Sequence, residues 1–167
     1  GDGIYVAKLD SNGNWLWAKQ TGGTNYDYGC GITVDANENS YVTGVFYSNS
    51  ITFGTITLTN SSSGYADIFV AKLDSNGNWL WAKQTGGTGN DYGYGIAVDD
   101  NGNSYVTGCF EISATFGDTT LTSIGGGDIF VAKLGEGNSI NLPDIISFNG
   151  IRSIYPNPFN PLTTIDY

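Results

Sequence analysis

The stretch VAKLDSNGNWLWAKQTGGT occurs twice in this chain without a single change, at residues 6–24 and again at residues 70–88. The two copies are 64 positions apart. The match continues at the same offset, because YGCGITVDANENSYVTGVF at residues 28–46 aligns with YGYGIAVDDNGNSYVTGCF at residues 92–110. Self-similarity with this period indicates a chain built from stacked structural repeats.

Each repeat is expected to consist of β-strands. The run IFVAKLD is short and rich in β-branched and aromatic residues, and the Asn-Gly pair in the SNGN that follows is typical of a tight hairpin. WLWAKQ then forms a second strand, with both tryptophans expected on one face. A second hairpin, with DNGN between GIAVD and SYVTGCF, adds two more strands. Because no segment has a sustained 3.6-residue apolar period, the sequence predicts an all-β fold of four-stranded antiparallel blades.

Three motifs carry a resemblance to a known family. In order along the chain, GGTGNDYGYGIAVDDNGNSYVTGCF, TFGDTTLTS and GGGDIFVAKL resemble the bacterial β-propeller repeat family called SBBP. The resemblance covers roughly residues 1–134, and it is specific because several motifs recur in the same order. It implies a bladed fold and no particular activity.

The repeats predict a blade-repeat domain over residues 1–137 and a separate tail over residues 138–167. Counting strands gives about two and a half blades, whereas a closed ring typically has four to eight. An incomplete ring of this kind leaves apolar faces and strand edges bare. Two explanations stay open: copies of the chain complete one another in a ring or a filament, or the chain is a fragment of a longer propeller.

The tail contains YPNPFNPLTTIDY at residues 155–167. This stretch resembles the opening of the C-terminal sorting domain of type IX secretion cargo in Bacteroidetes-like bacteria, because PNPFNP stands directly before TTIDY. The family domain continues for several more strands that are absent here, and an ordinary proline-rich turn is the alternative. The resemblance implies an extracellular or cell-surface location. We expect the last strand to add to a neighbouring copy by β-augmentation. The residues expected in this assembly contact are Leu162, Thr164, Ile165 and Tyr167.

The composition argues against several classes of function. A net charge of −10 repels phosphate backbones, so nucleic-acid binding is not expected. No run of 18 apolar residues is present, so no membrane-spanning helix is expected. The chain has no histidine, so zinc sites and Ser-His or Cys-His nucleophiles lack their usual imidazole. We therefore expect no cofactor and no enzyme activity. Cys30 and Cys109 are expected to be buried free thiols, with a disulfide as the alternative.

Three turns carry oxygen-bearing side chains at the first, third and fifth positions, as a calcium loop does. They are DSNGN, DSNGN and DDNGN. Asn-Gly forms turns without metal, and the twelfth position of each lacks glutamate, so the turn interpretation is preferred and calcium is the alternative. The candidate ligands are Asp10, Asn12, Asp74, Asn76, Asp99 and Asn101.

Other recurring side chains also have a structural and a functional interpretation. Asp27 and Asp91 would suit acid–base catalysis as a pair, but their recurrence once per blade is typical of structural loop residues. Asn60 begins an Asn-Ser-Ser glycosylation triplet. The tryptophans belong either to the core between blades or to sugar-stacking platforms. They are Trp15, Trp17, Trp79 and Trp81.

Five lysines recur in register and are expected to form surface ion pairs with recurring acids such as Asp10 and Asp74. They are Lys8, Lys19, Lys72, Lys83 and Lys133.

Together these observations predict a secreted structural protein that self-associates into an extracellular assembly, such as a filament of identical subunits. The alternative is a fragment of a larger propeller that binds a ligand, for example a glycan, between blades. Saturable glycan binding by a monomer would favour the alternative.

Overall fold

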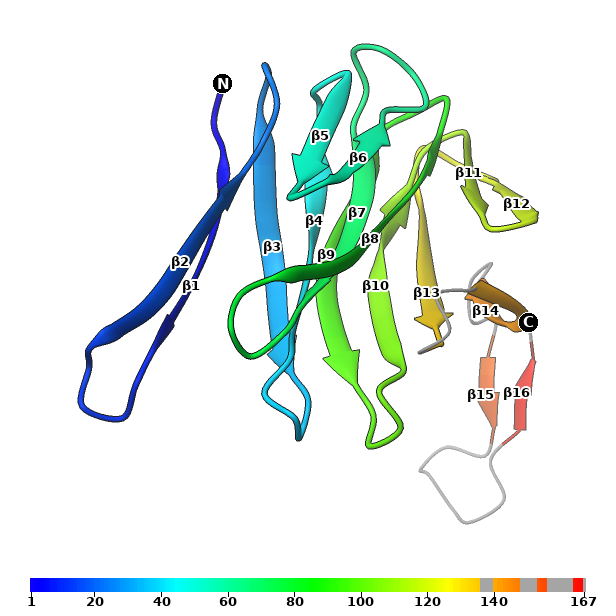
Figure 1. Ribbon diagram of the computed structural model, residues 1–167. Coiled ribbons are helices and arrows are strands. Elements are labelled where there is room, and N and C mark those ends of the chain that lie inside the picture. Colours follow the sequence, from blue (N-terminus) through cyan, green and yellow to red (C-terminus); the bar gives the residue numbers. More distant parts are fainter. Residues whose placement is uncertain (136–139, 148–152, 156–163, 167) are drawn as a thin grey trace.

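The computed structural model describes residues 1–135, 140–147, 153–155 and 164–166, with side chains for residues 1–135. Within these residues the chain forms strands and no helix (Figure 1), and accordingly none of them builds an apolar helix of membrane-spanning length. The strands are β1 (Ile4–Leu9), β2 (Trp15–Thr21), β3 (Asp27–Val34), β4 (Ser40–Phe46), β5 (Ser50–Phe53), β6 (Ile56–Thr59), β7 (Asp67–Leu73), β8 (Trp79–Gly87), β9 (Asp91–Val98), β10 (Ser104–Phe110), β11 (Ser113–Phe116), β12 (Thr119–Thr122), β13 (Asp128–Leu134), β14 (Ile140–Ser147), β15 (Ser153–Tyr155) and β16 (Thr164–Asp166).

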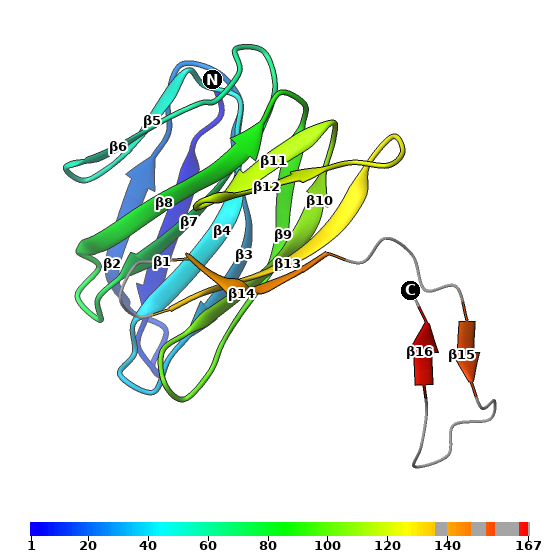
Figure 2. The same ribbon diagram turned by 90° about the vertical axis from the view of Figure 1, so that its right-hand side faces the viewer.

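The strands form three successive blades (Figures 1 and 2). Blade I is the antiparallel pair β1–β2, which is half a blade. Blade II has the order β3-β4-β7-β8, and blade III has the order β9-β10-β13-β14. The hairpin β15–β16 stands apart from the blades in Figure 2. The predicted all-β fold with four-stranded antiparallel blades is confirmed, and over the described residues the ring is not closed.

The fourth strand of blade III comes from residues that the sequence analysis assigned to the tail. Strand β14 pairs with β13, with Phe130 opposite Ser147 and Leu134 opposite Ile140. The repeat motif is absent from β14, so its sequence does not predict a blade strand. The blade therefore continues beyond the end of the repeated sequence.

Apolar side chains are buried between the blades. Strand β7 is apolar on both faces, and all of its residues are buried. One face meets blade I in a first cluster, and the other meets blade III in a second. The first cluster contains Ile4, Val6, Val42, Phe46, Ile51, Phe53, Leu58, Phe69, Ala71, Leu73 and Ala82. The second contains Ile68, Val70, Val106, Phe110, Ala114, Phe116, Phe130, Ala132 and Leu134. Since each buried Phe, Leu, Ile or Val side chain stabilises by about 1.5–3 kcal/mol, each blade depends on its neighbours.

The two clusters have the same construction. In each, the Ile and Val of one IxVAKL strand meet the aromatic residue, Ala and Leu of the next IxVAKL strand. The hairpins β5–β6 and β11–β12 add a hydrogen bond to each of these contacts. The Thr21 hydroxyl donates to the carbonyl of Thr52 in β5, and the Thr85 hydroxyl donates to the carbonyl of Thr115 in β11. Stacking is therefore directional, with different faces on the two sides of every blade.

A β-bulge separates the two tryptophans of each WLWAKQ strand, which corrects the sequence prediction that they share a face. Leu73 lies opposite Trp79 and Lys72 lies opposite Trp81, so Leu80 is the additional residue. Trp79 consequently packs against the first cluster and Trp81 against the second. The bulge shifts the alternation by one residue, which a strict period of two does not anticipate.

Four Asp-x-Asn-x-Asn turns join strands at one end of the blades. Their fourth residue has a positive φ, for which glycine is favoured. Gly13, Gly77 and Gly102 have φ of 85°, 80° and 78° in three of the turns. Glu38 holds the same position with a φ of 63° in the fourth. All four turns thus share one backbone geometry. Their fourth position is glycine in three turns and glutamate in one.

Candidate functional site

The identical stretches give the most informative comparison in the molecule, because the same side chains lie in two environments. Leu73 in blade II is fully buried, whereas its counterpart Leu9 in blade I is 45% exposed. Trp79 packs edge-on against Phe53 at 4.9 Å, whereas its counterpart Trp15 is 68% exposed. The side chains of β1 and β2 that lack the cover of their counterparts form what we call the open face of blade I. They are Tyr5, Ala7, Leu9, Trp15 and Ala18.

The opposite end of the stack exposes the other half of the same contact. In β7, Ile68 and Val70 are buried against blade III. Their counterparts in β13 are Ile129, which is 56% exposed, and Val131, which is half-buried. We call Ile129 and Val131 the open face of blade III. The two open faces are therefore the unmatched halves of an interface that occurs twice inside the chain.

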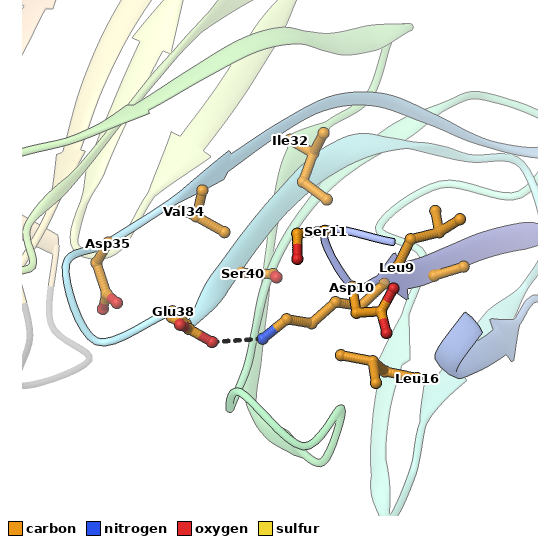
Figure 3. Close-up of a pocket in the computed structure, with 11 residues that line it drawn as sticks. Leu9, Asp10, Ser11, Leu16, Ile32, Val34, Asp35, Glu38 and Ser40 are labelled. Atoms are coloured by element: carbon orange, nitrogen blue, oxygen red, sulfur yellow. Dashed lines mark hydrogen bonds and ion pairs between the residues drawn. The ribbon is translucent and has the colours of Figure 1, made fainter. Parts of the chain in front are cut away.

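A groove of about 560 Å³ lies between β1 and β3 (Figure 3). Its apolar wall includes Ile32 and Val34, which are 58% and 60% exposed. The corresponding residues of blade III, Ile96 and Val98, are only partly exposed, because β9 packs against both β3 and β4 of blade II. Among the described residues no strand of blade I lies in those places, so Ile32 and Val34 of β3 stay exposed to the groove.

Charged side chains cross the groove at its rim. Lys8 donates to Glu38 at 2.6 Å (Figure 3), and this contact lowers the pKa of the Glu38 carboxyl. The counterpart Lys72 is buried, 3.8 Å from Asp35 and 4.7 Å from the centre of the Tyr41 ring. These lysines therefore contact Glu38 and Asp35, which both lie in the turn between β3 and β4, and pairing of the recurring lysines with Asp10 and Asp74 stays a prediction. The Lys8–Glu38 pair joins blade I to blade II, whereas Lys72 and Asp35 both belong to blade II, so both pairs depend on tertiary contacts that local sequence does not define.

The aspartates among the calcium candidates accept hydrogen bonds inside their own turns. The backbone amides of Asn12 and Asn14 donate to Asp10 Oδ1, at 2.9 and 2.8 Å respectively. The side-chain Nδ2 of Asn14 donates to Asp10 Oδ2. The other turns repeat this pattern around Asp74 and Asp99. The side-chain amides of the Asn residues lead the interactions that lower the pKa of these aspartates. This geometry favours the turn interpretation, and calcium binding by Asp10, Asn12, Asp74, Asn76, Asp99 or Asn101 stays a prediction.

Asp27 and Asp91 occupy equivalent positions and have different surroundings. Asp27 accepts hydrogen bonds from the amide of Gly23 and from Ser48. Asp91 is fully buried, accepts from the amide of Gly87 at 2.7 Å, and leaves its Oδ1 without a hydrogen-bond partner. Burial, together with the charge of Asp67, raises the pKa of Asp91 to about 7. The two recurring aspartates are thus held separately, each by its own loop, and a catalytic role for them stays untested.

The tryptophans divide between the core and the surface. Trp17, Trp79 and Trp81 pack against the two buried clusters, and Trp17 Nε1 donates to the carbonyl of Ser75 at 3.0 Å. The core interpretation holds for these three. Trp15 is exposed, so it is the tryptophan that remains available for contact with another molecule.

Both cysteines are free, as the preferred interpretation held, but Cys30 is exposed and Cys109 is only partly buried. Cys30 is exposed because it is the unpaired residue of a bulge in β3, between the pairs formed by Gly29 and Gly31. The expectation that Cys30 is buried is therefore wrong.

Two further predicted sites are not tested by the contacts. Asn60 Nδ2 donates to the carbonyls of Phe46 and Tyr65, so its amide already serves the loop, and glycosylation stays a prediction. Of the expected assembly residues, Thr164 and Ile165 lie in β16, which pairs with β15. Leu162 and Tyr167 lie outside the described residues.

Comparison with known proteins agrees with this architecture. Residues 16–53 and 80–108 match the SBBP family, described as a beta-propeller repeat. Both matched segments are therefore similar to β-propeller repeats. These matches confirm the SBBP resemblance in two regions, while the resemblance to a sorting domain stays a prediction.

Two curated relatives resemble this chain over part of their length. An uncharacterized WD repeat-containing protein of Acanthamoeba polyphaga mimivirus is 34% identical over 115 residues, which cover 59% of this chain and 8% of the relative. The regulatory protein FlaEY of Caulobacter vibrioides is 29% identical over 106 residues, which cover 63% of this chain and 11% of the relative. The matched part of the chain thus spans about a tenth of the length of these relatives.

Proposed function

We propose that this chain is a structural subunit that self-associates head to tail in an extracellular assembly, with neighbouring copies completing the blades. The observation that carries the proposal is the double environment of the nineteen identical residues. In blade II the side chains on both faces of β7 are buried, whereas in blade I the face of β1 that carries Ala7 and Leu9 is exposed. A surface built for burial that is left open is typical of an interaction site.

The two open faces are complementary in chemistry. In the contact between blades I and II, the aromatic residue, Ala and Leu of β7 meet the Ile and Val of β1. The open face of blade I carries the same aromatic, Ala and Leu pattern, and the open face of blade III carries the same Ile and Val pattern. A contact between opposite ends is heterologous. It gives a ring when the rotation closes and a filament when it does not.

The extracellular location rests on a different part of the chain. It is supported by the resemblance of residues 155–167 to the opening of a sorting domain. The acidic surface, with a net charge of −10, is compatible with a soluble assembly.

A second candidate function is glycan binding by a propeller segment. The exposed indole of Trp15 and the exposed ring of Tyr5, at 68% and 71%, favour it, because flat aromatic surfaces stack on sugar rings. Saturable binding of a glycan by the single chain, lost in Trp15→Ala, would support this function in place of self-association.

Sedimentation velocity from micromolar to millimolar concentration tests the proposal. We expect the mass to rise with concentration, and Leu9→Glu to remain a single chain because it places a charge on the open face of blade I. Leu80→Glu is the matched control, because Leu80 is 50% exposed in β8 and lies outside both open faces. A single-chain mass for the wild type throughout this range, or equal association of Leu9→Glu, would contradict the proposal.

A further inference from the structure

The free edge of β1 is the starting point for an inference about what fills the groove. Strands β7 and β13 both pair with β8 or β14 on one side and with a SYVTG strand on the other. Strand β1 repeats their sequence but pairs only with β2 among the described residues. Its second edge therefore presents backbone N–H and C=O groups for which the repeat itself defines a partner.

The complete blades show the register of that partner. Opposite β7, Ser40 pairs with Leu73, Tyr41 with Lys72, and so on to Phe46 with Asp67. Opposite β13, the seven pairs from Ser104 to Phe110 follow the same order. Two independent copies with one register indicate that the pairing is specified by the side chains.

A glycine in the partner strand meets the aromatic residue of the IxVAKL strand. Gly44 lies opposite Phe69, and a Cβ at Gly44 would lie 2.8 Å from the Phe69 ring. Gly108 and Phe130 repeat this pair with the same 2.8 Å approach. A larger residue at this place would collide with the backbone carbonyl of Tyr28 or Tyr92 in the adjacent strand and with the ring. In β1 the aromatic residue is Tyr5, so an incoming strand in the same register places its glycine opposite Tyr5.

A tyrosine in the partner strand meets the lysine. The amino group of Lys72 lies 4.7 Å from the centre of the Tyr41 ring, and that of Lys133 lies 5.8 Å from the Tyr105 ring. Such contacts between a cation and an aromatic face are favourable. In β1 the lysine is Lys8, at the rim of the groove.

From these four observations we propose that the groove between β1 and β3 is a strand-acceptor site, filled by an antiparallel Ser-Tyr-Val-Thr-Gly-apolar-Phe strand from another blade-repeat unit. The strand pairs with β1 so that its glycine faces Tyr5 and its tyrosine stacks on Lys8. Its other side covers the exposed wall formed by Ile32 and Val34. The inference rests on the proposed function, because it names the segment by which a neighbouring copy completes blade I.

Fluorescence anisotropy with a labelled peptide of residues 37–47, NENSYVTGVFY, tests the site on the full chain. We expect saturable binding, and at least about a tenfold loss of affinity when the peptide carries Gly44→Val, which fills the space over Tyr5. Ile32→Glu in the protein should cause a similar loss, whereas Leu80→Glu, a charge on an exposed leucine outside the groove, should leave binding unchanged. Hydrogen exchange should show protection of the β1 amides when the peptide is bound.

Several results would overturn the inference. They are absence of saturable binding, equal binding of the Gly44→Val peptide, or unchanged binding to Ile32→Glu. Sedimentation in parallel separates this inference from the proposed function. Peptide binding by a chain that never self-associates would leave the acceptor site standing and reject the assembly. An assembly that neither binds the peptide nor is dissociated by it would reject the acceptor site alone.

Discussion

At the scale of single residues, the two copies of the SNGN turn provide a matched pair for backbone strain. Gly13 and Gly77 have nearly equal φ of 85° and 80°. An added Cβ meets nothing within 4 Å at Gly13, but lies 2.7 Å from the Trp17 ring at Gly77. The first site therefore reports the backbone conformation alone, and the second adds the contact between blades.

We predict that Gly13→Ala lowers the free energy of unfolding by about 1 kcal/mol, the cost of a left-handed conformation for alanine. Gly77→Ala should cost more, because Trp17 must also move. Urea unfolding of both variants measures the difference. Equal losses would mean that the contact of Gly77 with Trp17 does not contribute to stability.

Asp91 gives a prediction for pH. Its pKa is raised from 3.8 to about 7, chiefly by burial, so the folded chain favours the protonated carboxyl. The contribution of Asp91 to stability is therefore fully present below about pH 4 and is lost as the pH rises through about 7. We expect this loss to be about 1–2 kcal/mol.

Asp91→Asn isolates this effect from other carboxylates, several of which have lowered pKa values and act in the opposite direction. Asparagine keeps an oxygen for the Gly87 amide but does not titrate near neutrality. Relative to the wild type, the variant should gain stability between pH 5 and pH 8 in thermal unfolding. A difference that stays constant over this range would show that Asp91 titrates normally.

At the scale of the strand, β1 and β7 test whether environment or sequence determines stability. Leu9 and Leu73 occupy the same position in the two identical stretches, but Leu73 is buried and Leu9 is 45% exposed. We predict that Leu73→Ala costs about 2–5 kcal/mol. Leu9→Ala should cost less than about 1 kcal/mol at concentrations where the chain is a monomer. Chemical denaturation of both variants provides the comparison, and a large loss for Leu9→Ala in the monomer would mean that its face is already covered.

Strand-level features divide clearly into those that the sequence could predict and those that it could not. The strand and turn pattern of DIFVAKL and SNGN is local, so it predicted the all-β blades and the incomplete ring correctly. The burial of Trp17, Trp79 and Trp81 also agrees with expectation. In contrast, the bulge at Leu80 is set by pairing with β7, and it moves the two tryptophans of β8 to opposite faces.

The candidate site was harder to predict than the fold, because it is defined by a missing neighbour. Leu9 and Trp15 are exposed, but the surrounding sequence is identical to that around Leu73 and Trp79. Their exposure therefore cannot be inferred from the sequence. The partner of Lys8 is likewise a residue of the next blade, Glu38. One signal was available: β1 repeats the sequence of β7 and β13, and each of those two strands pairs with a SYVTG strand.

At the scale of the whole molecule, the central claim is that the two ends of the stack are complementary. Blade I exposes a face whose counterpart in blade II is buried against an Ile and a Val. Blade III exposes the corresponding Ile and Val, which are Ile129 and Val131. One variant can block each end separately. Leu9→Glu alters only the first open face, and Ile129→Glu alters only the second.

The most direct measurement is the mass, by sedimentation equilibrium, of these two variants alone and mixed in equal amounts. Each variant alone keeps only one functional end, so we predict a single-chain mass for both. The mixture should form pairs and stop there, because only the unmodified end of one variant can meet the unmodified end of the other. A mixture that remains at the mass of one chain, or a variant that assembles by itself, would contradict head-to-tail association through the open faces.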